Sequence, residues 1–463
     1  MDSLISGEIL AALMFFGVIF ALLIGFPVAF SLAGVSLIVS LAGWSLGVFD
    51  FSNFGALASR YIGFMTNEVL VAVPLFIFMG VTLERSGIAE GLLITMGKIF
   101  GRMRGGLGLS VIVVGALLAA STGVVGATVV TMGLISLPAM LRAGYDPKLA
   151  CGVICASGTL GQIVPPSTVL IFMGDMLGGI NAQVQMAKGN FAPSPVSVGD
   201  LFVGAILPSL VLILLYMLYM IYKAIFDPKS CPAAPGTAEE REALLGEVFT
   251  ALLPPLLLII AVLGSILAGL ATPTEAASVG AVGAMVLVAF KGRFKYELIR
   301  QACISTATIT SMVFVLLLGA AVFSIVFRML GGDDLVHQLL SDLPGGAVGA
   351  LIVVMLVMFV LGFILDTFEI IFIIIPITAP VLLNLDVNPV WLGVLVGVNL
   401  QTSFMTPPFG FSLFYLRGVA PGSVSTGTIY RGIVPFVGLQ VIALAILLTF
   451  PELATWLPRL VFG

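Results

Sequence analysis

Two groups of oxygen-bearing residues lie within long apolar stretches of the sequence and could bind a small cation. The first group consists of hydroxyl residues and glycines, namely Ser121, Thr122, Gly123, Ser157, Gly158 and Thr159. The second group adds a carboxylate and an amide, namely Asp366, Thr367, Asn399, Thr402 and Thr406. Oxygen ligands suit hard cations, and neither group holds the several carboxylates that calcium prefers. The groups therefore predict sodium sites, with hydrogen bonding between packed helices as the alternative for each hydroxyl.

Asp366 is the sharpest of these candidates because it is a carboxylate in an otherwise apolar stretch. An acidic residue inside a membrane is a functional hypothesis by default. Asp366 could ligate an ion, carry a proton or cap a helix. Glu275 follows Thr272 by three residues at a predicted helix start, where capping on the outer surface is the better explanation. The sequence does not decide the role of Glu369, and His337 is expected at a solvated surface.

Composition sets the fold class. The chain has 463 residues, of which 60% are hydrophobic and 9% are charged, whereas a soluble protein carries roughly a quarter charged residues. Apolar runs such as 9–26 and 207–221 recur along the sequence, and such runs match the ~30 Å hydrocarbon core of a bilayer. The sequence predicts an all-α polytopic membrane protein. It contains no basic patch that would favour nucleic acid binding.

Several kinds of chemistry have no support in the sequence. A P-loop, an HExxH helix and a nucleophile elbow are all absent, so neither ATP hydrolysis nor another enzymatic reaction is predicted, and no organic cofactor. Of the four cysteines, Cys151, Cys155, Cys231 and Cys303, the first two are one helical turn apart in an apolar stretch. They are expected to be small buried apolar residues, with a metal or redox role as the alternative. The start of the chain lacks a basic segment and a cleavage site, so 9–26 is predicted to be a permanent first span.

The polar groups coincide with interruptions of the apolar stretches. A helix break inside a membrane frees backbone groups, which only protein, ions or water can satisfy. Paired breaks in two halves of a transporter indicate a binding site near the membrane midplane, while kinks in packed helices are the alternative. No basic residue lies deep within these segments. An anionic substrate would therefore be held by helix N-termini, hydroxyls and bound cations.

The prolines indicate that the chain is an internal duplication. The same two spacings, nine and eighteen residues, separate Pro138, Pro147 and Pro165 in one half and Pro380, Pro389 and Pro407 in the other. A hydrophilic linker, 227–247, divides the halves. The predicted repeats are 1–226, with a hairpin at 107–142 and a broken helix at 149–177, and 248–463, with a hairpin at 347–384 and a broken helix at 390–416.

Basic residues favour the cytoplasmic side of a membrane, so they predict how the two repeats are oriented. If each hairpin enters and leaves on one side, each repeat crosses about five times and the repeats are inverted. Fifteen Lys and Arg residues then lie on the side of the linker, and only Arg60, Lys188, Arg328 and Arg459 lie on the other. If each hairpin segment crossed the membrane once instead, eleven basic residues would lie on one side and eight on the other. The split predicts re-entrant hairpins, outer termini and a cytoplasmic linker.

Several short segments resemble the signature of one transporter family. In the second half these are GFILDT at 362–367, PITAP at 376–380, Asn399 and TPPFG at 406–410. TPTEAA at 272–277, and SGT at 157–159 with PPS at 165–167, resemble further motifs of that family. The chain is similar over essentially its whole length to the large membrane subunit of TRAP (tripartite ATP-independent periplasmic) transporters.

The resemblance implies an elevator-type, sodium-coupled importer of organic acids in the bacterial inner membrane, with scaffold and transport domains. It implies two partners, a small four-helix membrane subunit and a soluble periplasmic substrate-binding protein. The hairpin tips at 121–123 and 366–367 would flank the substrate. The residues expected to bind it are Thr122, Gly123, Gln162, Pro165, Ser167, Thr367, Gln401 and Pro407.

One departure from the commonest family pattern bears on the substrate. The segments QTSF at 401–404 and FGFSLFYLR at 409–417 resemble the branch associated with 2-oxo acids and with aromatic or hydroxy acids. The alternative function is a stand-alone sodium/dicarboxylate symporter of similar inverted-repeat build, which would work without a binding protein. A channel and an intramembrane enzyme are the remaining classes, and the missing catalytic constellation counts against the enzyme.

Overall fold

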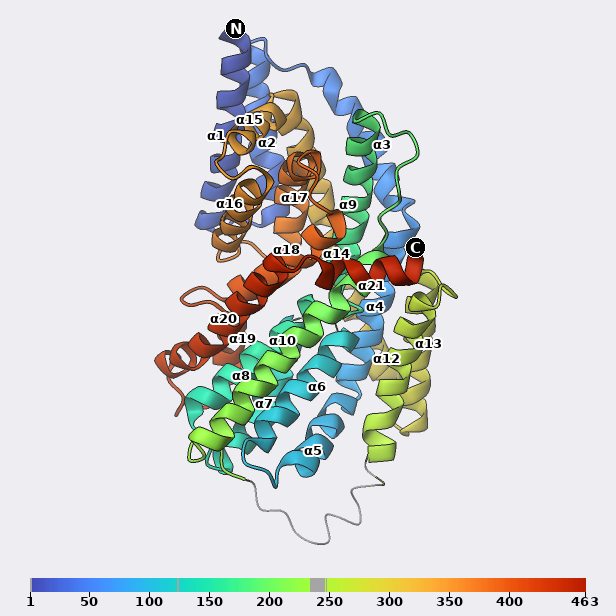
Figure 1. Cartoon of the computed structure of the whole chain (residues 1–463). Helices are drawn as coiled ribbons and strands as arrows, with labels where there is room; N and C mark the ends of the chain where they lie inside the picture. Colours follow the sequence, from blue (N-terminus) through green and yellow to red (C-terminus); the bar gives the residue numbers. More distant parts are fainter. Residues whose placement is uncertain (1, 123–124, 234–245, 247) are drawn as a thin grey trace. The chain divides into compact units, whose positions relative to one another are not determined.

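The computed structural model of the chain describes residues 2–122, 125–233, 246 and 248–463, which are almost entirely helical (Figure 1). Within these residues there is no β-strand. Helices satisfy their own backbone hydrogen bonds, which a lipid environment demands of any spanning segment. Nine helices of the described chain are long and apolar enough to cross a membrane, or up to eleven if each of two bent helix pairs is one span. The chain is therefore an all-helical polytopic membrane protein, as its composition predicts.

The helices pack into two compact units. The first unit comprises Met1–Leu70, Asp175–Val196 and Thr308–Pro389. Its complete elements are α1 (Asp2–Ile24), α2 (Val28–Ser45), η1 (Phe51–Phe54), α3 (Gly55–Met65), α15 (Gly332–Ser341), α16 (Gly346–Leu361) and α17 (Thr367–Asn384). Within this unit, α16 packs on α17 and α1 packs on α2.

The second unit comprises Val71–Gly174, Ser197–Ala307 and Val390–Gly463. Its elements are α5 (Ile88–Phe100), α6 (Gly106–Thr122), α7 (Val125–Arg142), α8 (Pro147–Thr159), η2 (Leu160–Gln162), α10 (Val198–Phe226), η3 (Val248–Leu252), α12 (Leu253–Leu267), α13 (Pro273–Phe290), α18 (Pro389–Met405), α19 (Phe411–Val419), α20 (Thr426–Thr449) and α21 (Glu452–Phe462). Three helices continue along the chain from one unit into the other, namely α4 (Glu68–Arg85), α9 (Thr168–Ala187) and α14 (Tyr296–Met329).

The compact units do not coincide with the two predicted repeats, because each unit combines segments of both sequence halves. The predicted hairpin at 107–142 corresponds to α6 and α7 in the second unit, and the hairpin at 347–384 corresponds to α16 and α17 in the first. A repeat is a relation between sequences, whereas a unit is a result of packing. The division into two repeats therefore stays a prediction.

The two broken helices have shorter interruptions than their polar segments predict, which are 157–167 and 399–408. The first break covers only 163–167, because α8 continues to Thr159 and a single 3-10 turn follows. The second break covers 406–410, because α18 continues to Met405. Polar residues stay helical here by donating to carbonyls of the preceding turn, as Thr159 does to Ala156 at 2.9 Å and Ser403 to Leu400 at 2.9 Å.

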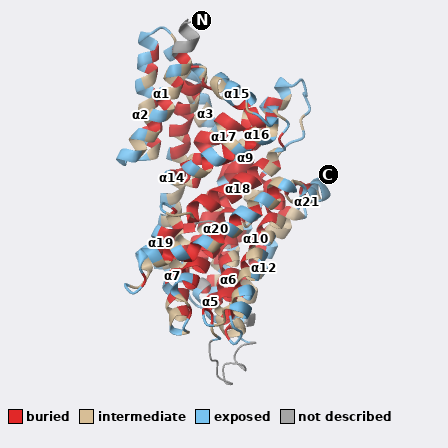
Figure 2. Cartoon of the chain, turned by 60° about the vertical axis from the view of Figure 1, so that its left-hand side comes forward, coloured by how far each residue is buried: buried red, intermediate tan, exposed pale blue. Residues whose placement is uncertain are grey.

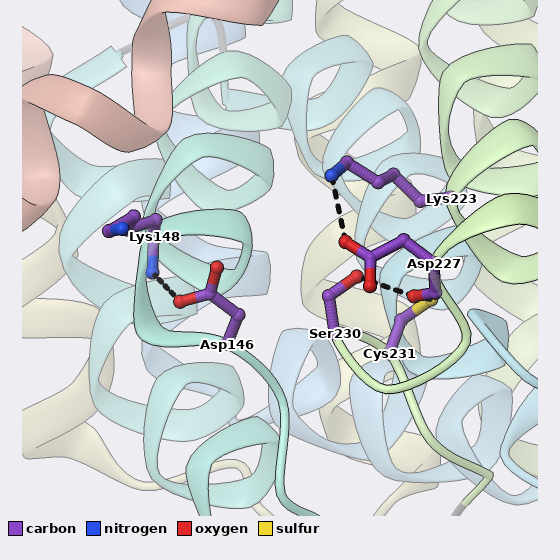
Figure 3. Close-up of polar contacts among 6 residues, drawn as sticks. All are labelled: Asp146, Lys148, Lys223, Asp227, Ser230 and Cys231. Atoms are coloured by element: carbon purple, nitrogen blue, oxygen red, sulfur yellow. Dashed lines mark hydrogen bonds and ion pairs between the residues drawn. The ribbon is translucent and has the colours of Figure 1, made fainter.

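A short polar loop after α10 holds together one end of the second unit (Figure 3). The Lys223 ammonium pairs with the Asp227 carboxylate at 3.0 Å, and this hydrogen bond lowers the pKa of Asp227 below its usual value. The Ser230 carbonyl accepts the backbone N–H of Asp146 at 2.9 Å, next to the first turn of α8. The first residues of the predicted linker at 227–247 therefore fix the starting point of α8.

Candidate functional site

The helix α8 carries the first group of predicted site residues. Asp146 caps its N-terminus by accepting the N–H of Lys148, and Pro147 occupies the first turn, where its fixed φ suits a helix. Gly115 of α6 lies so close that a Cβ there would be 2.6 Å from the Cβ of Ser157. The hydroxyl of Ser157 is buried and has no hydrogen-bond partner within the described part of the chain.

The helix α18 brings second-half residues to α8 within the second unit. All residues of α18 except Pro389 and Trp391 are buried (Figure 2). The side-chain amide of Gln401 donates to the hydroxyl of Thr159 at 3.3 Å. The other amide atom of Gln401, Oε1, is buried and accepts no hydrogen bond from any described residue. We refer to Ser157, Thr159 and Gln401 as the α8–α18 polar junction.

Unsatisfied oxygens at this junction are informative because leaving a buried polar atom without a partner costs roughly 1–3 kcal/mol. Two such atoms, Ser157 Oγ and Gln401 Oε1, belong to fully buried side chains of the same unit. Thr159 Oγ1 donates to Ala156 and accepts from Gln401, which leaves acceptor capacity on the hydroxyl. The junction therefore presents oxygen atoms that a cation or a hydrogen-bond donor could satisfy.

A hydrogen-bonded network continues from the neighbouring residue of α18. The hydroxyl of Thr402 donates to the Val398 carbonyl at 2.8 Å and lies 3.3 Å from Oε1 of Gln440 on α20. The amide nitrogen of Gln440 donates to the Tyr216 hydroxyl on α10 at 2.8 Å. Because Gln440 and Tyr216 are fully buried, this network fixes the orientation of Thr402 from outside the junction.

The remaining residues of the broken helices are held by their own backbone. Ser167, at the end of the first break, donates to the Gln162 carbonyl at 2.9 Å, and both side chains are buried. Thr406, at the second break, donates to the Thr402 carbonyl at 2.7 Å. Asn399 is buried on α18. The hydrogen bonds of Ser167 and Thr406 fix the backbone next to the two Pro-Pro pairs.

The other predicted residues fall into three places. Gly158 packs against α7, where a Cβ would run into Val129. Asp366 and Thr367 belong to the first compact unit. Ser121 and Thr122 end α6, which packs on α8, but their side chains lie outside the described part of the structure, as does Gly123 altogether.

Asp366 caps α17. Its carboxylate accepts the N–H of Thr367 at 2.7 Å, and its own N–H donates to the Glu369 carboxylate at 2.8 Å in a capping box. The capping alternative is therefore seen for Asp366, and Glu369 is its partner. Thr272 and Glu275 form the same arrangement at the start of α13, which confirms capping as the role of Glu275.

Sequence reasoning missed several residues that the structure places in polar surroundings. Gln440 and Tyr216 drew no attention, because an isolated polar residue in an apolar span has no spacing pattern. Asp175 of α9 could have been found, because it is an acidic residue in an apolar stretch just as Asp366 is. Its carboxylate accepts a hydrogen bond from the Asn67 amide at 2.8 Å in the first unit. Among the described residues no cluster of His, Cys, Asp and Glu suited to a metal ion occurs.

Comparison with known families gives a match over nearly the whole chain. Residues 15–453 match the model of "Tripartite ATP-independent periplasmic transporter, DctM component". The C4-dicarboxylate TRAP transporter large permease protein DctM of Vibrio cholerae is 29% identical, over 98% of each chain. The ectoine TRAP transporter large permease protein TeaC of Halomonas elongata is 28% identical, over 95% of this chain and 97% of that protein.

A further relative and a solved structure are also similar to this chain. The sialic acid TRAP transporter permease protein SiaT of Haemophilus influenzae is 26% identical over 94% of this chain, which spans 66% of that longer protein. Among solved structures, the Alcanivorax borkumensis YdaH transporter has a similar fold, with a TM-score of 0.60 over 87% of this chain and 89% of that chain. The sequence identity in this last case is 17%, so the likeness concerns the fold alone.

Proposed function

Because the chain belongs to the DctM component family of tripartite ATP-independent periplasmic transporters, we propose that it imports a small organic acid together with sodium ions. The family is one of multi-pass permeases of the bacterial inner membrane and not of enzymes. Its relatives in the comparison are named for C4-dicarboxylates, ectoine and sialic acid. These names have in common small molecules that carry a carboxylate, which supports an organic acid as the substrate class here.

One observation carries the assignment of the site. The α8–α18 polar junction buries two oxygen atoms, Ser157 Oγ and Gln401 Oε1, that no described residue satisfies. We place a sodium ion against the hydroxyls of Ser157 and Thr159, since hydroxyl oxygens are acceptable ligands of a hard cation. Gln401 then faces the substrate, and Thr402, oriented by Gln440, contributes to the second ion site. For the other residues of the two oxygen-bearing groups we propose the predicted role of sodium ligands. For the other residues expected to bind the substrate we propose that role.

The order of the elements supports the repeat part of the proposal. Pro138 lies inside α7 and Pro380 inside α17, while Pro147 begins α8 and Pro389 begins α18. The series α6–α7–α8 thus has the same proline pattern as α16–α17–α18. We interpret the two series as inverted repeats whose hairpins and broken helices form the moving part of an elevator.

The tripartite name of the family supports two partners for this chain. We propose that a small four-helix membrane subunit and a soluble periplasmic binding protein complete the system. The binding protein would deliver the organic acid to the outer side of the permease. The competing function is a sodium/dicarboxylate symporter that works alone.

Reconstitution tests the proposal. The full chain, with its small subunit, is placed in proteoliposomes and given an inward sodium gradient and acid-loaded binding protein, without ATP. We expect uptake only when both the sodium gradient and the binding protein are present. Full uptake without the binding protein would favour the stand-alone symporter, and full uptake with a proton gradient in sodium-free buffer would reverse the ion assignment.

A further inference from the structure

The first compact unit contains a cavity of about 390 Å³ that none of the predicted site residues lines. It is surrounded by α3, α17 and the parts of α9 and α14 that belong to this unit. Pockets that hold small organic ligands have volumes of roughly 300–1,000 Å³. The cavity is therefore large enough for a small organic molecule.

Two arginines line this cavity, Arg60 of α3 and Arg328 of α14. The two guanidinium groups repel each other as like charges, and the Asp333 carboxylate offsets part of this repulsion at Arg60. Arg328 pairs through Nε with Asp333 at 2.9 Å. Arg60 forms no hydrogen bond or ion pair with any described residue. A bound anion would satisfy Arg60 and relieve the repulsion between the two cations.

The cavity wall also carries one acidic side chain, Asp175 of α9. Its partner is the neutral amide of Asn67, at 2.8 Å, rather than an arginine. The same wall therefore offers a cationic group for an anion and a carboxylate acceptor for a hydrogen-bond donor. The lining also includes the apolar side chains Phe64, Leu317 and Phe372, which suit a short carbon skeleton.

We propose that this cavity is a second binding site of the chain, for a small acid that carries a carboxylate and a hydroxyl or amine. The carboxylate binds Arg60 and Arg328, and the hydroxyl or amine donates to Asp175. The site belongs to the unit that does not contain the α8–α18 polar junction, and no sodium ligand takes part. Basic residues at 60 and 328 fall on the predicted outer side, from which an organic acid would arrive.

Equilibrium binding of radiolabelled malate to the full chain tests this site. The chain is held in nanodiscs of zwitterionic lipid and in sodium-free buffer, so that sodium-dependent binding at the junction does not contribute. We expect saturable malate binding that is tighter than succinate binding, because succinate lacks the hydroxyl. Arg60→Gln should weaken malate binding about tenfold or more, since a charge-assisted hydrogen bond is lost. Asp175→Asn should remove most of the preference for malate.

Two glycines of α3 provide a steric test and its control. Gly63 lines the cavity and a Cβ there would meet no other atom within 4 Å, so Gly63→Leu should fill the cavity and abolish sodium-free malate binding. Gly55 is equally open but does not line the cavity, so Gly55→Leu should bind malate as the unmodified chain does. Lys188→Gln, which removes a cation of the same unit outside the cavity, is the matched charge control.

Several results would overturn the proposal. These are the absence of malate binding without sodium, and unchanged binding in both Arg60→Gln and Gly63→Leu. Displacement of malate by inorganic phosphate at lower concentration than by unlabelled malate would show a general oxyanion site. Loss of malate binding when phosphatidylglycerol is included in the nanodiscs would assign the cavity to a lipid headgroup. None of these results affects sodium-driven uptake, which tests the transport function separately.

Discussion

At the scale of single residues, the account depends on buried oxygens without a protein partner. Ser157 Oγ and Gln401 Oε1 are such atoms in the described chain, whereas the neighbouring Ser403 hydroxyl is satisfied by Leu400. A satisfied hydroxyl contributes to the fold, while an unsatisfied one costs stability until a ligand binds. This difference allows a ligand to be distinguished from a structural residue by experiment.

Ser157→Ala should separate these two roles. We expect the thermal stability of the ligand-free chain in potassium chloride to stay the same or to rise, because the substitution removes an unsatisfied buried hydroxyl. The stabilisation that sodium chloride gives at equal ionic strength should fall. Thermal unfolding of the purified chain in the two salts measures both effects. A less stable chain with an unchanged response to sodium would mean that Ser157 is structural.

Asp366 has a visible structural role, so its two substitutions should differ. Asp366→Asn keeps a good capping residue and should leave unfolding nearly unchanged, while Asp366→Ala should cost about 0.5–2 kcal/mol. If the carboxylate also ligates sodium, Asp366→Asn should raise the sodium half-saturation of transport about tenfold, which corresponds to ~1.4 kcal/mol. Chemical denaturation and sodium-dependent uptake check the two parts. An unchanged half-saturation would leave Asp366 with capping alone.

At the scale of elements, glycines let the backbones of α8 and α20 come into direct contact. A Cβ on Gly432 of α20 would run into the backbone carbonyl of Lys148 on α8, and one on Gly152 of α8 would run into that of Gly432. Gly-rich contacts of this kind are typical of membrane helices, where packing replaces the hydrophobic effect. The contact holds α8 in the place where Thr159 reaches Gln401.

Two glycines of α20 test this contact directly. Gly432→Ala should destabilise the chain by about 1–3 kcal/mol, the usual cost of overpacking, because a backbone carbonyl cannot move aside cheaply. Gly438→Ala is the control, since a Cβ there would meet no atom within 4 Å. It should be neutral or should stabilise the helix by roughly 0.5–1 kcal/mol. Equal thermal midpoints for the two variants would contradict the close approach.

The sequence predicted the elements better than it predicted their contacts. The predicted broken helices at 149–177 and 390–416 begin within two residues of α8 and α18, and each is interrupted at its Pro-Pro pair, because proline restricts the backbone locally. The breaks are shorter than expected, because side-chain hydrogen bonds to the preceding turn keep Thr159 and Ser403 helical. The bond between Thr159 and Gln401 joins residues 242 positions apart. Such a contact depends on which helix faces meet, and no local pattern records that.

At the scale of the whole molecule, the prediction that remains open is the orientation of the repeats. The nine to eleven possible spans among the described residues agree with a polytopic protein, and the side on which each loop lies is a separate question. Fifteen of nineteen basic residues fall on one side in the inverted arrangement. This asymmetry follows the preference of Lys and Arg for the cytoplasm.

Cysteine labelling decides the orientation. Lys188→Cys should react with an impermeant reagent added from the periplasm, while Lys229→Cys and Arg293→Cys should react only after the cytoplasmic side is opened. All three positions are exposed, and the exposed native thiol is removed by Cys303→Ser in the parent chain. Labelling of all three positions from one side would exclude the inverted repeats.

The most direct test of the central claim is the sodium dependence of uptake in Thr159→Val proteoliposomes, supplied with saturating acid-loaded binding protein. Valine keeps the shape of threonine but removes the hydroxyl that joins α8 to Gln401. If the α8–α18 polar junction binds the coupling ion, the sodium half-saturation should rise about tenfold or more, while Ser403→Ala should behave as the unmodified chain. An unchanged half-saturation in Thr159→Val would contradict the assignment of the ion site to this junction.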